Sequence, residues 1–131
     1  DRRFVTKEDK EQLLAEEGSA WKLVEKMNDP VTGEALSVRL PGTYSGDRFR
    51  KEEAIRVWVG PEGEVSFNDA MVSPGRVGEV LAAKLALNPR LLIALYADAR
   101  VPYATIARII EQIQLARAPR VIFTTERRAA R

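Results

Sequence analysis

The chain of 131 residues contains no cysteine and no histidine. Without cysteine it has no disulfide and no thiolate for metal binding or nucleophilic catalysis, and without histidine a serine or cysteine triad lacks its usual base. No glycine-rich phosphate loop precedes a predicted helix at the required spacing. We therefore expect no catalytic residues, no metal and no cofactor.

Long apolar runs are absent as well. No segment approaches the roughly 20 apolar residues that cross a bilayer, and no signal sequence is recognisable, because the chain opens on Asp1-Arg2-Arg3 without methionine. We interpret the sequence as part of a longer protein. Its 21 basic and 19 acidic residues give a net charge of +2, which attracts phosphate only weakly, so we expect no nucleic-acid partner. Arginines near the C-terminus leave a basic RNA-binding domain as a distant alternative.

What the chain does contain is organised around residues 91–125. Leu91 to Ala97 is an uncharged run without alternation, which is typical of a strand covered on both faces and predicts a place in the middle of a sheet. Pro102 suits the first turn of a helix, and apolar residues then recur at helical spacing, at Ile106, Ile109, Ile110 and Ile113. A proline ends this helix, and Val121 to Thr124 favours a returning strand.

Two shorter strands and a further helix precede this unit. Residues 55–59 and 65–67 alternate apolar with polar side chains around a proline and glycine turn, which predicts a β-hairpin. Asn68-Asp69 marks a second turn, and Ser73 is a candidate cap for the helix that follows. The order strand, strand, helix, strand, helix, strand predicts an α+β fold, a two-layer α/β sandwich with helices on one face of the sheet.

The N-terminal residues 1–35 predict a helical arm. Thr6 with Asp9 resembles a helix cap, and residues 8–17 favour a helix. A second helical piece is expected from Ala20, because three apolar residues fall on one side, namely Trp21, Val24 and Met27. The arm either docks loosely on a surface near the membrane or binds a partner through Trp21, and both interpretations stay open.

An additional edge strand is predicted between the arm and the folded domain. Apolar and polar residues alternate, and a proline at the end confines the strand to the edge or end of a sheet. The polar loop that follows would let it pair within its own domain or with another copy. The candidate pairing strand consists of Leu36, Val38, Arg39, Leu40 and Pro41. The predicted divisions are an arm (1–35), an edge strand and linker (36–50), a folded domain (51–125) and a basic tail (126–131) that frays.

The acid in the most suggestive position is Asp98, at the end of the buried strand, where sheets of this kind often expose functional groups. Its alternative role is to cap the turn by accepting backbone amides near Ala99 to Val101. We expect Tyr103, on the first turn of the helix, to be half-buried with its hydroxyl reaching water. Neither residue is assigned a catalytic role.

The span from Leu40 to Thr125 resembles the periplasmic domain of the ExbD/TolR family of biopolymer-transport proteins. Four features carry the resemblance, and the most specific of them is the block with aspartate, valine and tyrosine directly after an apolar strand. Two departures are a missing glycine after Asn68 and an arm longer than the family's usual linker. The four features are Val38-x-Leu40-Pro41, the strand, turn and strand of Val57 to Phe67 around Glu62-Gly63, the block Ala97-Asp98-x-x-Val101-x-Tyr103, and the closing Val121-x-Phe123-Thr124-Thr125.

The resemblance implies a non-enzymatic periplasmic domain, anchored to the inner membrane, of a motor driven by the proton motive force. It implies a homodimer, an ExbB/TolQ-type channel subunit reached through an N-terminal membrane helix that this chain does not contain, and a TonB/TolA-type partner. A peptidoglycan-binding module of a TolR-like complex is the alternative. The family's proton-carrying aspartate lies in that membrane helix, so Asp98 does not inherit its role.

Alternation along the central strand predicts which side of the sheet stays apolar. Residues 91, 93, 95 and 97 should face the helices, which leaves an apolar set on the opposite face. We expect a second copy, the arm near Trp21, or both to cover this face. We also expect residues 36–40 to add to a sheet edge, either within one copy or exchanged between copies. Aspartate at Val38 or Leu40 should then abolish partner binding while the core stays folded. The candidate interface residues are Trp58, Leu92 and Tyr96, together with Trp21.

Overall fold

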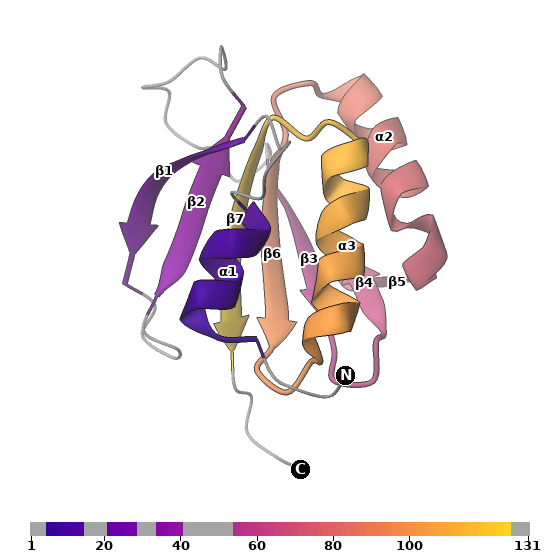
Figure 1. Ribbon diagram of the computed structural model, residues 1–131. Helices are drawn as coiled ribbons and strands as arrows, with labels where there is room; N and C mark the ends of the chain where they lie inside the picture. Colours follow the sequence, from indigo (N-terminus) through magenta and orange to yellow (C-terminus); the bar gives the residue numbers. More distant parts are fainter. Residues whose placement is uncertain (1–4, 15–20, 29–33, 41–53, 127–131) are drawn as a thin grey trace.

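The computed structural model describes residues 5–14, 21–28, 34–40 and 54–126. A seven-stranded sheet with the order β1-β2-β7-β6-β3-β4-β5 forms one layer, and the described helices form the second layer on one of its faces (Figure 1). The predicted two-layer α+β sandwich is confirmed. In chain order the elements are α1 (Lys7–Leu14), β1 (Lys22–Met27), β2 (Ala35–Arg39), β3 (Ala54–Val59), β4 (Val65–Phe67), β5 (Ala70–Val72), the 3-10 turn η2 (Pro74–Arg76), α2 (Val77–Leu87), β6 (Leu92–Asp98), α3 (Tyr103–Leu115) and β7 (Arg120–Glu126).

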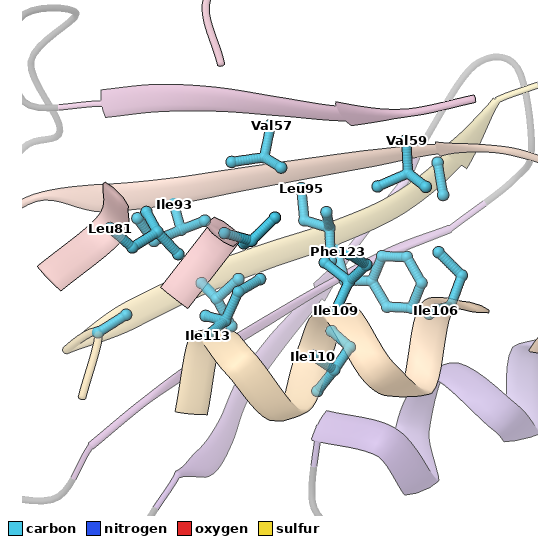
Figure 2. Close-up of a cluster of buried hydrophobic side chains, with 14 of the residues drawn as sticks. Val57, Val59, Leu81, Ile93, Leu95, Ile106, Ile109, Ile110, Ile113 and Phe123 are labelled. Carbon is cyan, nitrogen blue, oxygen red and sulfur yellow. The ribbon is translucent and has the colours of Figure 1, made fainter. Parts of the chain in front are cut away.

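Strand β6 lies at the centre of the sheet, as its uncharged sequence predicts. It pairs in parallel with β3 on one side and with β7 on the other. Ile93 and Leu95 point toward the helices, where the buried face of α3 meets them together with Phe123 of β7 (Figure 2). Burial of these side chains, each worth roughly 1.5 to 3 kcal/mol, joins the two layers.

The second hairpin turn has a defined backbone. Asn68 and Asp69 connect β4 to β5 and have φ angles of 49° and 77°. A two-residue turn of type I′ requires a positive φ at both positions, which asparagine and aspartate tolerate better than most residues. The side chain of Asn68 also accepts a hydrogen bond of 2.9 Å from the amide of Arg56. The turn therefore forms without the glycine that the family resemblance leads one to expect after Asn68.

Helix starts follow the sequence in two of three cases. The hydroxyl of Thr6 accepts the amide of Asp9 (3.2 Å), and the carboxylate of Asp9 accepts the amide of Thr6 (3.0 Å), so the predicted reciprocal cap of α1 is present. Pro102 occupies the N-cap of α3. Ser73 precedes η2 but makes no side-chain capping bond, so its predicted capping role is wrong.

The predicted second helix of the arm is wrong. Lys22 to Met27 forms strand β1, which pairs antiparallel with β2 and shifts register between Leu23 and Glu25. The segment has apolar residues three apart and good helix formers, but the neighbouring strand supplies hydrogen bonds that local propensity cannot anticipate. The remainder of the predicted first helix, residues 15–17, lies outside the described residues.

The predicted edge position of β2 is also wrong. β2 pairs with β1 on one side and with β7 on the other, so both of its edges are used within one chain. Among the described strands, β1 and β5 are the outermost. The predicted loop 42–50 and the fraying tail after Glu126 fall outside the described residues.

Candidate functional site

The candidate pairing strand is divided between the two faces of the sheet. Leu36 and Val38 are fully buried in the core shared with the helices. Arg39 is partly exposed on the other face, and the amide of Leu40 donates to the carbonyl of Pro119 at 2.8 Å. An aspartate at Val38 would therefore unfold the domain instead of leaving the core intact, contrary to the prediction. Pro41 lies outside the described residues.

Trp21 is a core residue. Only 4% of it is exposed, and its indole Nε1 donates a hydrogen bond of 2.8 Å to the carbonyl oxygen of Ala118. Leu13 and Leu14 of α1 belong to the same buried cluster. The described part of the predicted arm thus packs into the sandwich, and Trp21 does not present an exposed anchor for a partner.

Trp58 and Tyr96 are adjacent on neighbouring parallel strands. Their Cα positions are in register between β3 and β6, on the face opposite the core, and both side chains are half-buried. Leu92 lies on the same face, but only 1% of it is exposed. The structure therefore brings together two of the predicted interface residues as a partly accessible aromatic pair, while the third is buried.

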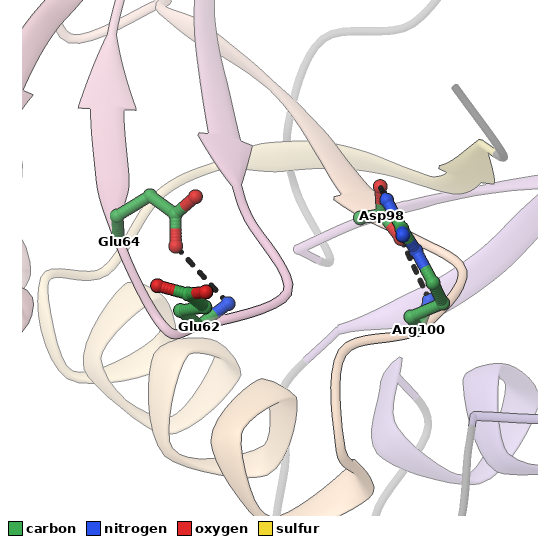
Figure 3. Close-up of polar contacts among 4 residues, drawn as sticks. All are labelled: Glu62, Glu64, Asp98 and Arg100. Carbon is green, nitrogen blue, oxygen red and sulfur yellow. Dashed lines mark hydrogen bonds and ion pairs between the residues drawn. The ribbon is translucent and has the colours of Figure 1, made fainter. Parts of the chain in front are cut away.

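Asp98 terminates β6 and closes the turn that leads to α3. Its carboxylate is 2% exposed and accepts hydrogen bonds of 2.9 Å from the amide, Nε and Nη2 of Arg100 (Figure 3). The hydrogen bonds that the Arg100 guanidinium donates to Asp98, together with the negative charge of Asp98, raise the pKa of Arg100 above its ordinary value. The predicted capping role of Asp98 is confirmed.

The two other motif residues serve the same turn and helix start. The amide of Val101 donates to the carbonyl of Asp98 at 2.9 Å, and the Val101 side chain is buried. Tyr103 is half-buried against the core, as expected. The specific spacing of aspartate, valine and tyrosine therefore describes how this strand turns into this helix.

One buried charge on α1, that of Lys10, was not anticipated. Lys10 is 4% exposed, and its Nζ donates to the carbonyl of Glu34 (2.9 Å) and to Oγ1 of Thr125 (3.5 Å). A lysine among acidic neighbours in a helix predicts a solvated side chain, because the sequence does not indicate that β2 and β7 run beneath it. These bonds attach α1 to the residue that precedes β2 and to strand β7.

A second polar contact joins α1 to the strand that follows it. Nζ of Lys26 lies 2.7 Å from Oε2 of Glu11, and both side chains are largely exposed. The hydrogen bond lowers the pKa of the Glu11 carboxyl below its ordinary value and raises the pKa of Lys26 above its own. The pair is the principal described electrostatic contact between α1 and β1.

Metal and membrane sites were also considered. Among residues 5–14, 21–28, 34–40 and 54–126, no three acidic or other ligating side chains are arranged to hold a metal ion. Within the same ranges, no helix has both the length and the apolar character needed to cross a membrane.

Comparison with known proteins identifies the family. No curated protein matches the chain significantly. The family described as "Biopolymer transport protein ExbD/TolR" matches residues 27–128. This span includes strands β2, β3, β4, β5, β6 and β7 and both α2 and α3. Helix α1 and nearly all of β1 precede the matched span. The chain therefore belongs to the ExbD/TolR family of biopolymer transport proteins.

Proposed function

We propose that this chain is the periplasmic domain of an inner-membrane subunit that couples a proton-driven motor to transport across the cell envelope. The observation that carries the proposal is the family match over residues 27–128, which covers the motif around Asp98. In this proposal the domain is non-enzymatic. It acts by binding other proteins, and a membrane helix outside this chain joins it to an ExbB/TolQ-type channel subunit.

The proposed binding partners are a second copy of the chain and an energy-transducing protein of the TonB or TolA type. The aromatic pair of Trp58 and Tyr96 supports the sheet face as the contact surface, because both rings are only half-buried and no described helix lies on that side. Aromatic side chains combine a large apolar area with low conformational freedom and are enriched at interfaces.

Exchange of residues 36–40 between copies is possible in this proposal only if β2 separates from both of its neighbouring strands. Both edges of β2 are hydrogen-bonded, to β1 and to β7, and Val38 is fully buried. Exchange would require β2 to leave both neighbours and return to equivalent positions in a second copy. Contact through the sheet face requires no such rearrangement and is therefore the mode we favour.

Photo-crosslinking in living cells tests the proposal. The full-length protein would carry a photoreactive phenylalanine analogue at Trp58 or Tyr96, with Arg108 on the exposed surface of α3 as the matched control site. We expect crosslinks from the sheet face to a second copy or to the transducing partner, and we expect their yield to change when the proton gradient is collapsed. Crosslinks that are equal at the three sites and insensitive to the gradient would contradict the motor role.

Peptidoglycan binding by a TolR-like complex is the alternative function. Retention of the purified domain on isolated sacculi, lost on Trp58→Ala and Tyr96→Ala substitution, would support it. In the motor proposal the same two positions crosslink to a protein, so the ligand that is captured, protein or sacculus, decides between the two functions.

A further inference from the structure

Three cations occupy directly opposing positions on three neighbouring strands. Lys22 of β1 is in register with Arg39 of β2, and Arg39 is in register with Arg120 of β7. Neighbouring strands lie about 4.8 Å apart, so the row of Lys22, Arg39 and Arg120 extends over roughly 10 Å across the strand direction. We refer to these three residues as the cationic row.

The cationic row lies on the sheet face opposite the helices. Val38 and Val121, which precede Arg39 and follow Arg120, are buried in the core with the helices. Because successive side chains of a strand point to opposite faces, the two arginines point away from the helices. Lys22 is exposed and the arginines are partly exposed, and the row ends at the buried Leu92 of β6, which is in register with Arg120.

No described ion pair involves a member of the cationic row. Five other cations form ion pairs within the described part of the chain, namely Lys7, Lys26, Arg56, Arg76 and Arg100. Like charges directly opposite one another on adjacent strands are destabilising. The like-charge repulsion across the row opposes folding, and an anionic ligand bound over the row would relieve it.

We propose that the cationic row binds an acidic helix of a partner protein. Carboxylates at positions i, i+4 and i+7 of a helix lie on one face and extend over about 10.5 Å, which matches the length of the row. Arginine binds carboxylates in bidentate geometry, and two of the three positions are arginine. The partner helix then crosses the strands of β1, β2 and β7. The inference rests on charge and register alone and stands independently of the motor role.

Fluorescence anisotropy with the intact chain and a designed probe tests this site. The probe is a helical peptide with glutamates at i, i+4 and i+7, and the comparison peptide has the same composition with its glutamates distributed around the helix. We expect the aligned peptide to bind more tightly and to weaken with added salt. Arg39→Gln combined with Arg120→Gln should weaken its binding by about tenfold.

The matched control removes the same charge from the helical layer. Lys84→Gln combined with Arg108→Gln changes two exposed residues on α2 and α3, and we expect its affinity for the aligned peptide to stay within about twofold of the unmodified chain. The row variant should melt at the same or a higher temperature, because it relieves like-charge repulsion, and this result separates lost binding from unfolding.

Three results would overturn the proposal. The first is an equal loss of affinity in the row and control variants, which would indicate attraction by net charge alone. The second is equal binding of the aligned and distributed peptides. The third is tighter binding of a polyuridine RNA or of phosphatidylglycerol vesicles than of the aligned peptide, which would assign the row to a different class of ligand.

Discussion

The indole Nε1 of Trp21 donates a hydrogen bond of 2.8 Å to the carbonyl oxygen of Ala118, 97 residues later in the chain. This bond joins the start of β1 to the connection between α3 and β7. Trp21→Phe keeps an aromatic ring but leaves the buried carbonyl without this donor, and we expect a loss of about 1–3 kcal/mol in the free energy of unfolding. Urea denaturation measures it. Trp58→Phe, at a half-buried site, is the matched control and should cost less.

The turn between β4 and β5 offers a stabilising substitution. Asp69 has a φ of 77°, so Asp69→Gly should relieve backbone strain and raise the free energy of unfolding by about 0.5–1 kcal/mol. The ion pair it removes, with Arg56 at 3.8 Å, is exposed and contributes little. Asn68→Gly should gain less, because it also removes the hydrogen bond to the amide of Arg56. A melting temperature below that of the unmodified chain for Asp69→Gly would refute the turn assignment.

The turn after β6 depends on the buried carboxylate of Asp98. Asp98→Ala removes the acceptor of the Arg100 amide and of its guanidinium, and we expect a loss of about 1–2 kcal/mol in chemical denaturation. Asp98→Asn should lose less, because its amide oxygen can still accept the backbone amide. Glu111→Ala, at an exposed position of α3, is the control. Equal effects of Asp98→Ala and Glu111→Ala would show that the turn does not require the carboxylate.

Acid should weaken the attachment of α1 to β1. The folded-state pKa of Glu11 lies below its ordinary value of 4.5 because Lys26 donates a hydrogen bond to it. A lowered folded pKa contributes stability above the unfolded pKa, and this contribution is lost as the pH falls through the folded value. Glu11→Gln should therefore reduce the loss of stability between about pH 5 and pH 3, measured by thermal unfolding, whereas Glu111→Gln should not. An unchanged acid dependence in Glu11→Gln would exclude this pair as a source of stability.

The C-terminal half of the sandwich follows from local sequence patterns. Each element here is predicted by a pattern of only a few residues. β6 is predicted by its uncharged run, α3 by the helical spacing of its isoleucines, and the start of α3 by Pro102. The Asp98 turn follows for the same reason, since its acceptor and its donors are neighbours in the sequence.

The N-terminal elements could not be predicted in this way. β1 is extended because it pairs with β2. The buried indole of Trp21 is hydrogen-bonded to the carbonyl oxygen of Ala118, shortly before β7. Hydrogen bonds to the next strand in the chain, β2, override the helical propensity of Lys22 to Met27. The cationic row was missed for the same reason, because Lys22, Arg39 and Arg120 become neighbours only when three strands are placed in register.

Strand β1 forms an outer edge of the sheet and lies almost entirely outside the span that the family model matches. The family match begins at Met27, the last residue of β1, so the extension supplies an outer border of lysines and an irregular register in place of the edge of β2. Such a border discourages the addition of foreign strands. A segment that extends this sheet by one strand on the β1 side would therefore meet a charged and irregular edge.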